Sequence, residues 1–188
     1  MDFLFNVASI EITTARVKLR PLQHTDLLDF HAYASIPGVG ELAGWPYHKD
    51  LEQSRQVLDQ YINEGKYFAI YHLADRRVIG QVALGKAWIN RHPKYQDLKA
   101  KNISYALSPS YWGRGLVPEV VEALIDYGFN TLGIQAFGVE HFVHNVQSQR
   151  VIEKLGFTLV QEGTYHAKEL GQVFAEYRYV LLQPDRQG

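Results

Sequence analysis

Seven segments of the chain alternate apolar with polar positions or form short apolar runs between turn residues, a pattern typical of β-strands. We expect strands at 10–22, 67–73, 77–84, 102–107, 135–144, 157–165 and 173–182. Only the three residues Ala74-Asp75-Arg76 separate the second strand from the third, which predicts a hairpin. Pro21 ends the first run, because proline has no N–H group to donate to a neighbouring strand.

Four other segments place their apolar residues at the spacing of a helix. They lie at about 27–34, 50–64, 118–129 and 146–155. Thr25 and Asp26 can cap the first helix, and Pro118 suits the first turn of the third. The element order is therefore β-α-α-β-β-β-α-β-α-β-β, which indicates an α/β fold with helices on the faces of one sheet. Because no repeat or linker interrupts this order, we expect a single domain over residues 1–188.

The composition is that of a globular protein, with 46% hydrophobic and 21% charged residues among 188. Nineteen lysines and arginines against twenty acidic residues leave a formal charge of −1, so a broad nucleic-acid surface is excluded. The chain has no cysteine, which excludes disulfides, thiolate metal sites and a cysteine nucleophile. No segment approaches the ~20 apolar residues of a membrane helix, and no signal peptide is recognisable, so we expect a cytoplasmic protein.

The chemically informative segment is the loop at 108–119, where a strand leads into a helix. Gly113 and Gly115 let backbone amides approach an anion there, and the helix start adds unpaired N–H groups. These features suit a pyrophosphate, although a plain tight turn would use the same residues. Pro118 stands where a dinucleotide-binding loop needs a small third residue, and no Gly-Lys-Ser/Thr triplet of a P-loop follows.

Two blocks of sequence resemble the GNAT acetyltransferase superfamily. Residues 110–115, Ser-Tyr-Trp-Gly-Arg-Gly, are similar to its Gln/Arg-x-x-Gly-x-Gly/Ala signature, with Ser110 in place of the first residue. Residues 145–157 resemble the Asn-x-x-Ser…Glu-Lys-Leu-Gly-Phe block of its ribosomal-protein N-terminal acetyltransferase (RimJ/RimL-like) branch. The resemblance covers about 17–182. It implies a mixed sheet of about seven strands, splayed between the fourth and fifth, with four helices on its faces.

The resemblance also implies acetyl-CoA as co-substrate, with its pantetheine arm between the strands at 102–107 and 135–144. This arm would contact the backbone near the end of the strand at 102–107, and the glycine loop would contact the pyrophosphate. Arg114 could add a charged contact or simply be a solvated loop residue. Asn145 would contact the cofactor, cap its helix, or do both. The implied cofactor-binding residues are Tyr105, Ala106, Leu107, Trp112, Gly113, Arg114, Gly115, Leu116, Val117 and Asn145.

Acetyl transfer needs a donor of a proton to the leaving thiolate and an acceptor of the amine proton. Many GNAT members use a tyrosine as the donor, but its place is taken by Ile152, and the branch resemblance points to Ser148 instead. Ser148 could alternatively only satisfy the turn after Asn145. Asn102 stands where relatives often have an acid.

The proton acceptor must therefore lie elsewhere or be a water chain. Glu41 is the first candidate and His141 the second; the alternatives are a solvated loop acid and a hydrogen-bonded core imidazole. We expect no metal site, because His141 and His144 point to opposite faces of their strand.

The acceptor site is expected to be walled by aromatic residues, namely Tyr33, Trp45 and Tyr47, which could equally be core. The branch favours the α-amine of a protein or peptide as acceptor, with a small amine as the alternative, and no acidic cluster stands out. A CoA-binding regulatory module with little catalysis is the rival reading. The protein is expected to be a monomer or a homodimer.

Overall fold

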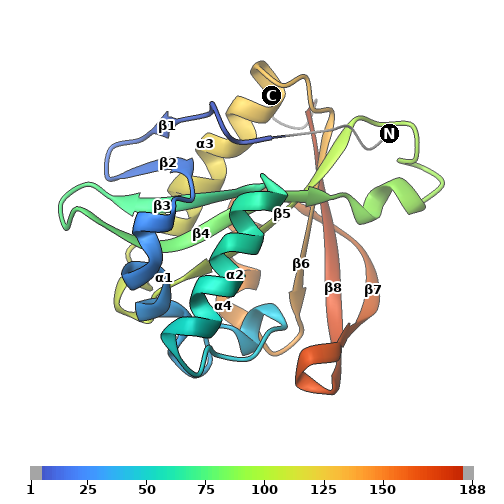
Figure 1. Cartoon of the computed structure of the whole chain (residues 1–188). Coiled ribbons are helices and arrows are strands. Elements are labelled where there is room, and N and C mark those ends of the chain that lie inside the picture. Colours follow the sequence, from blue (N-terminus) through green and yellow to red (C-terminus); the bar gives the residue numbers. More distant parts are fainter. Residues whose placement is uncertain (1–5, 184–188) are drawn as a thin grey trace.

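The computed structural model describes residues 6–183 and contains one mixed sheet of eight strands (Figure 1). The order across the sheet is β1-β2-β3-β4-β5-β6-β8-β7. The strands are β1 (Ile12–Thr13), β2 (Val17–Pro21), β3 (Tyr67–His72), β4 (Arg77–Lys86), β5 (Ala100–Leu107), β6 (Ala136–Phe142), β7 (Thr158–Ala167) and β8 (Gln172–Leu182). The mixed α/β class is confirmed, and the predicted order of elements holds except in the first strand.

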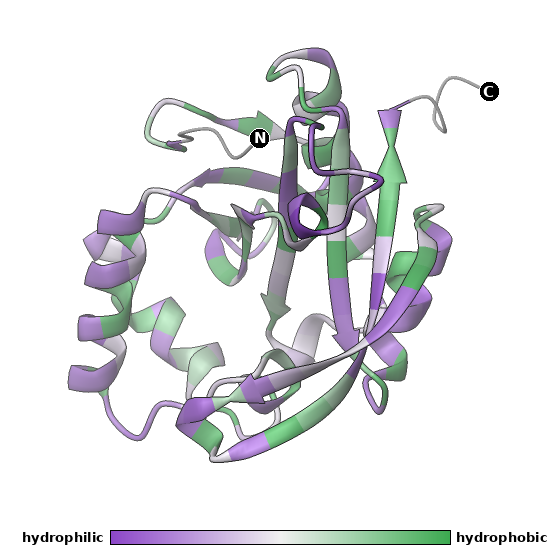
Figure 2. Cartoon of the chain, turned by 90° about the vertical axis from the view of Figure 1, so that its right-hand side faces the viewer, coloured by the Kyte–Doolittle hydropathy of each residue, from purple (hydrophilic) through white to green (hydrophobic). Residues whose placement is uncertain are grey.

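Four α-helices and several short 3-10 turns connect the strands. The α-helices are α1 (Leu27–Ala34), α2 (Leu51–Glu64), α3 (Leu116–Asn130) and α4 (Val146–Lys154). The 3-10 turns are η1 (His24–Asp26), η2 (Glu41–Ala43), η3 (Trp88–Arg91), η4 (Pro109–Tyr111) and η5 (Lys168–Leu170). The hairpin of β7 and β8 curves away from the rest of the sheet, and hydrophilic and hydrophobic residues mix along it (Figure 2).

The first predicted strand is in fact two strands, which is why the sheet has eight members where seven were expected. A turn separates β1 from β2, and in it the Thr14 hydroxyl and amide both donate hydrogen bonds to the Val17 carbonyl. β1 then pairs antiparallel with β2, with Ile12 opposite Leu19. The apolar positions change phase at the turn, from Ile10 and Ile12 before it to Ala15, Val17 and Leu19 after it, and this break in the alternation was the sequence signal of the reversal.

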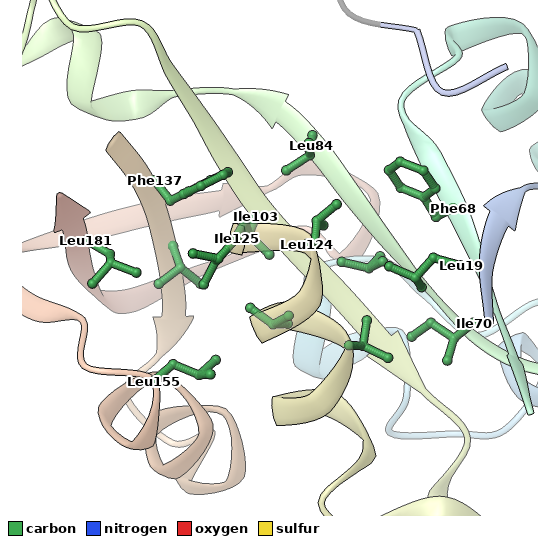
Figure 3. Packing of buried hydrophobic residues seen from close by; sticks show 14 of the residues in the cluster. Leu19, Phe68, Ile70, Leu84, Ile103, Leu124, Ile125, Phe137, Leu155 and Leu181 are labelled. Atoms are coloured by element: carbon green, nitrogen blue, oxygen red, sulfur yellow. The ribbon is translucent and has the colours of Figure 1, made fainter. Parts of the chain in front are cut away.

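The core has a separate layer on each face of the sheet. α3 and α4 cover one face through residues such as Leu124 and Ile152, and their layer is packed around Leu19, Phe68 and Ile103 (Figure 3). α1 and α2 cover the other face through Phe30 and Leu58 (Figure 1). The central strands are therefore buried on both faces, and only a break between strands can admit a ligand to the middle of the sheet.

Such a break lies between the parallel strands β5 and β6. Their pairing runs from Ala100 opposite Ala136 to Ile103 opposite Val139 and then stops, although both strands continue. β4 still pairs with β5 at Leu107, and β8 still pairs with β6 at Phe142. The last part of β5 therefore leans toward β4, the last part of β6 leans toward β8, and a V-shaped gap opens. The expected splay is confirmed.

Candidate active site

A large cavity, about 1130 Å³ in volume, includes this gap. Its lining comes from the separated ends of β5 and β6, the loop before α3, the start of α4, the segment around η2, α2, and the hairpin of β7 and β8. The cavity thus extends from the glycine loop on one side of the molecule to the hairpin on the other.

The glycine loop has the geometry expected of an anion site. Gly113 and Gly115 have φ angles of 73° and 72°, in the left-handed region that favours glycine. Gly115 is the N-cap of α3 and offers no side chain to the first N–H groups of the helix. These groups have no partner within the helix, and the positive end of the helix dipole lies with them. The loop can therefore hold a phosphate with backbone N–H groups.

Side chains on both sides hold this loop in place. The Trp112 indole donates a hydrogen bond to the Leu107 carbonyl at 2.8 Å, and Arg16 donates one to the Arg114 carbonyl at 2.8 Å. Arg16 also forms a salt bridge with Glu119 on α3. Burial alone would raise the pKa of Glu119, but hydrogen bonds from Thr14 and Arg16 lower it overall. The charged pair therefore links the turn between β1 and β2 to the start of α3.

Of the proposed cofactor-binding side chains in the loop, Arg114 points to a neighbour in the protein. Its guanidinium carbon lies 5.0 Å from the centre of the Tyr111 ring. Trp112, Gly113, Gly115, Leu116 and Val117 line the cavity.

The end of β5 presents main-chain groups to the gap at alternate residues. The Ser108 amide donates to the Ile79 carbonyl of β4, and alternate residues of an antiparallel ladder bond in this way. Ala106 therefore directs its main-chain groups toward β4, whereas Tyr105 and Leu107 direct theirs toward the gap. The Leu107 carbonyl is already occupied by Trp112. This narrows the predicted pantetheine contacts to Tyr105 and the Leu107 amide.

Two hydroxyl groups meet beside the gap. The Tyr105 and Ser148 oxygens are 2.7 Å apart, and both residues line the cavity. The Ser148 amide donates to the Asn145 side-chain oxygen at 3.1 Å, so Asn145 caps α4 as expected. The Asn145 amide also donates to the Leu42 carbonyl, which connects α4 to the η2 segment. Ser148 is thus held by its neighbours with its hydroxyl toward Tyr105. This geometry is consistent with a proton donor to the thiolate and equally with a residue that only satisfies the turn after Asn145.

Burial raises the pKa of Tyr105 to about 12, against the opposing effect of the hydrogen bond with Ser148. Tyr105 is therefore protonated at neutral pH and can act as a hydrogen-bond donor. Ile152, which stands at the position of the family tyrosine, is buried in the core and offers no proton.

Neither predicted proton acceptor is presented as a free base. The Glu41 carboxylate accepts hydrogen bonds from the Gly38 and Tyr47 amides, and Glu41 does not line the cavity. These hydrogen bonds hold the loop around η2 and agree with the alternative of a loop acid, so Glu41 as a base stays an untested prediction. His141 does line the cavity, but it is buried and both of its ring nitrogens are occupied. Nδ1 donates to the Phe142 carbonyl, and Nε2 forms a hydrogen bond with the Tyr179 hydroxyl at 3.0 Å.

The sequence reading missed Glu140, which lines the cavity one position beyond the last paired residues of β6. Asn102 donates a hydrogen bond from its amide to the Glu140 carboxylate at 2.7 Å. Burial raises the pKa of Glu140 to about 7, with Asn102 and Arg178 opposing the shift and Glu176 adding to it. An acid within the apolar run Phe-Gly-Val-Glu-His-Phe was the one available signal, since apolar strands of a covered sheet seldom carry charge.

Of the three predicted acceptor-site aromatics, only Trp45 lines the cavity. Tyr33 is buried in the layer under α1 and α2, where its hydroxyl donates to the Gln81 side chain at 2.9 Å. Tyr47 is exposed and lies outside the lining. Neither residue therefore lines the cavity, and Tyr33 has the core position that was its alternative. Helical spacing does not distinguish a core tyrosine from one on a cavity, and the path of the loop decided the position of Tyr47.

Other aromatic and acidic residues surround the end of the cavity near the hairpin. Tyr61 and Tyr67 stack with ring centres 3.7 Å apart. The acids that line this end come from four different elements: Glu64 of α2, Glu140 of β6, Glu169 of η5 and Glu176 of β8. The fold thus assembles an acidic group that no single stretch of sequence contains.

Within residues 6–183, no cluster of histidine, cysteine, aspartate or glutamate is arranged to hold a metal ion. Nor does that part of the chain contain a helix that is long and apolar enough to cross a membrane.

Comparison with known proteins gives a consistent picture. The family description "Acetyltransferase (GNAT) domain" matches residues 16–158. The chain is 33% identical over 151 residues to the probable N-acetyltransferase YjcK of Bacillus subtilis, covering 80% of this chain and 78% of that protein. The ribosomal-protein-S5-alanine acetyltransferase of Vibrio fischeri has a similar structure, with a TM-score of 0.71 at 20% identity over 94% of this chain and 98% of that one. The spermidine N-acetyltransferase of Vibrio cholerae, solved with CoA and spermine, matches with a TM-score of 0.73 at 18% identity over 93% and 100%.

Proposed function

The chain belongs to the GNAT acetyltransferase family, and from this premise we propose that a primary amine attacks the thioester of acetyl-CoA directly in the gap between β5 and β6. The observation that carries this proposal is the gap itself, with the Tyr105 and Ser148 hydroxyls beside it and the glycine loop lining the same cavity. Direct attack agrees with the absence of cysteine, because no protein thiol is present to carry the acetyl group.

The residues around the gap fit a molecule of this shape and charge. The main chain of Tyr105 and the Leu107 amide would pair with the amides of the pantetheine arm, like an added strand. The backbone N–H groups of residues 113–117 would hold the pyrophosphate, with Asn145 contacting the arm beyond the loop. Arg150 and Lys154 line the same cavity and would add positive charge for the phosphates.

The Tyr105 and Ser148 hydroxyls would supply the proton that the leaving sulfur takes up. Ser148 donates its proton or a hydrogen bond to the thiolate as the carbon–sulfur bond breaks, and Tyr105 replaces that proton through the 2.7 Å hydrogen bond. Both hydroxyls are protonated at neutral pH, so the pair is a donor under ordinary conditions.

The first candidate for the acceptor is the α-amine of a protein or peptide. The cavity extends to the surface, since the exposed residues Gln60, His166 and Lys168 line it. A peptide could therefore extend outward with only its first residues inside. Structural likeness to a ribosomal-protein acetyltransferase supports this candidate and the assignment to the RimJ/RimL-like branch.

A small amine with several positive charges is the second candidate. The specific observation in its favour is a set of carboxylates around Tyr165. Burial raises the pKa of Tyr165, and the nearby acids Glu169, Glu176 and Glu140 raise it further. Tyr165 itself lines the cavity, so these acids surround the space that an acceptor would enter. The similar fold of a spermidine N-acetyltransferase supports this candidate.

Release of free thiol from acetyl-CoA, measured across a panel of acceptors, tests the proposal. The panel should contain peptides with N-terminal serine or alanine, spermidine, and a monoamine of similar length. Faster turnover of peptides supports the first candidate, and faster turnover of spermidine than of the monoamine supports the second. Thermal stabilisation by CoA without turnover of any acceptor would favour a CoA-binding regulatory module, and no CoA binding would contradict both readings.

The cytoplasmic location and a monomeric or homodimeric state stay predictions. Cell fractionation checks the first, and light scattering during size-exclusion chromatography checks the second.

A further inference from the structure

We propose that Glu140 is the catalytic base that takes the proton of the acceptor amine, and that Asn102 is the positioning residue that holds the Glu140 carboxylate in place. This inference rests on the proposed function, because it assigns a role within amine acetylation. It starts from the position of Glu140, immediately after the paired residue Val139, where β6 begins to separate from β5. A side chain at this point lies at the base of the gap and lines the cavity.

The two faces of the sheet separate the acceptor side from the leaving-group side. On β5, Tyr105 packs with the layer under α3 and α4, whereas Ala106 belongs to the layer under α1 and α2. Because side chains alternate along a strand, Asn102 shares the face of Ala106. Val139 belongs to the α3 and α4 layer, so Glu140 faces the opposite way, toward Asn102. Glu140 and Ser148 are therefore on opposite faces, with the gap between them.

This arrangement suits a direct displacement. An amine that enters from the side of α1, α2 and the β7–β8 hairpin meets Glu140 before it reaches the thioester, while the sulfur leaves toward Ser148. His141, the neighbour of Glu140, lies on the other face and is bonded to Tyr179. Its position and its occupied nitrogens make it a poorer base for the same amine.

Asn102 fixes the Glu140 carboxylate without adding charge. Its Nδ2 group donates to one Glu140 oxygen and leaves the other oxygen available to a ligand. Gly138 makes room for this contact, because a β-carbon there would lie 2.7 Å from the Asn102 side-chain oxygen.

The charges around Glu140 are balanced in a way that leaves it able to take a proton near neutral pH. Glu176 faces it from β8 and is paired with Arg178, which is itself the residue opposite Glu140 in the sheet. The charge of Glu140 also raises the pKa of Tyr165 on β7. The pKa of Glu140, raised by burial to about 7, is that of a base that is half ionised at neutral pH.

The amine nitrogen forms a bond to the acetyl carbon, and its surplus proton passes to a Glu140 oxygen. The carbon–sulfur bond breaks, its electron pair stays on sulfur, and sulfur takes a proton from the Ser148 hydroxyl. Glu140 then releases its proton to water, and the Tyr105–Ser148 pair recovers one from water. The products are an amide and free CoA thiol, with no oxidant or reductant.

Glu140→Gln tests the proposal, because it keeps the shape of the side chain and an oxygen for the Asn102 hydrogen bond. With the best acceptor of the panel, we expect kcat/KM to fall about 10²- to 10³-fold. The rise of the wild-type rate between about pH 6 and pH 8 should disappear, since the pKa of Glu140 is about 7. Stabilisation by CoA should be unchanged. Glu162→Gln, a matched change at an exposed acid of β7, should keep the wild-type rate.

Two further variants separate a catalytic role from a structural one. Asn102→Ala removes the hydrogen bond that lowers the pKa of Glu140, so the midpoint of the pH profile should move upward. Adding Asn102→Asp to Glu140→Gln places a carboxylate on β5 next to residue 140 and should recover at least about tenfold of the lost rate if proton transfer was the defect.

An active wild type whose Glu140→Gln variant keeps both its rate and its pH profile would overturn this inference and leave the proposed function standing. A wild type that releases no thiol with any amine would instead contradict the proposed function. Recovery by the exchange variant would support the inference even if Glu140→Gln lowers the melting temperature.

Discussion

The hydroxyl oxygens of Tyr105 on β5 and Ser148 on α4 lie 2.7 Å apart across the boundary between strand and helix. The two residues are 43 positions apart in sequence. The N-cap hydrogen bond of α4, which the Ser148 amide donates to the Asn145 side chain, holds Ser148 in position. A pair of protonated hydroxyls at this place can pass a proton toward a leaving group and then recover one from water.

Ser148→Ala should therefore reduce turnover much more than cofactor affinity. We expect kcat to fall about 10²-fold, because the leaving thiolate loses its direct donor. The dissociation constant of acetyl-CoA, measured by calorimetry, should change by less than about threefold. Gln149→Ala, one residue along α4 and outside the cavity lining, is the matched control and should be neutral in both measurements. An equal loss of affinity in Ser148→Ala would show that the hydroxyl serves binding.

Tyr105→Phe should reduce kcat by a similar factor, and the double variant with Ser148→Ala should be little worse than either single variant. The reason is that two groups that act in series on one proton do not contribute independently. A cycle of the four proteins, assayed for thiol release under saturating substrates, measures the coupling. Additive losses in the logarithm of kcat would mean that the hydroxyls act separately.

Gly113→Ala should weaken acetyl-CoA binding at least about tenfold and cost about 1 kcal/mol of stability, since alanine resists the left-handed backbone at φ 73°. Gly171→Ala offers a close comparison. Gly171 has a φ of 62°, a β-carbon added to it would meet no other atom within 4 Å, and it is outside the cavity lining. It should show the same loss in thermal denaturation but normal binding, and identical binding constants for the two variants would contradict the role of the glycine loop.

Arg16→Ala should also weaken acetyl-CoA binding, although Arg16 does not line the cavity. The variant loses the hydrogen bond to the Arg114 carbonyl and the salt bridge to Glu119, so the loop and the start of α3 are held less firmly. Lys18→Ala on β2 removes a salt bridge to Glu11, away from the loop, and should bind normally. The comparison is made by titrating CoA into each protein, and normal binding by Arg16→Ala would remove the proposed linkage.

The raised pKa of Glu140 should also make the stability of the protein depend on pH, and this can be measured without an assay of activity. The folded-state pKa of about 7 lies above the ordinary value of 4.5, so the folded state favours the protonated acid. That contribution to stability is complete below about pH 4.5 and is lost as the pH rises through 7. Glu140→Gln has no such loss, and its melting temperature relative to the wild type should therefore rise between pH 5 and pH 8. A constant difference across this range would contradict the shifted pKa.

The cofactor side of the site could be read from sequence because it depends on local geometry. A strand, two glycines and a helix start within 108–119 determine where backbone N–H groups point, and Asn145 with Ser148 is a helix cap in one segment. The splay followed from family resemblance, and the pairing of β5 with β6 confirms it.

The acceptor side could not be read in this way, because tertiary contacts create it. Glu140 becomes a candidate only when Asn102 of a neighbouring strand bonds to it, and the four cavity acids come from four elements. Tyr33 and Glu41 have suitable side chains, but Tyr33 is buried in the core and Glu41 is hydrogen-bonded within its own loop. Sequence patterns specify which face of an element is apolar, and they do not specify which polar groups of distant elements meet.

The V-shaped gap between β5 and β6 has a consequence for how substrates enter and products leave. The sheet is covered on both faces, and under the proposed function the two substrates would reach the gap from opposite sides. The acetylated product can retreat on the side from which the amine came, while the spent thiol carrier departs on the other. In that arrangement neither product would block the other, so either product could leave first.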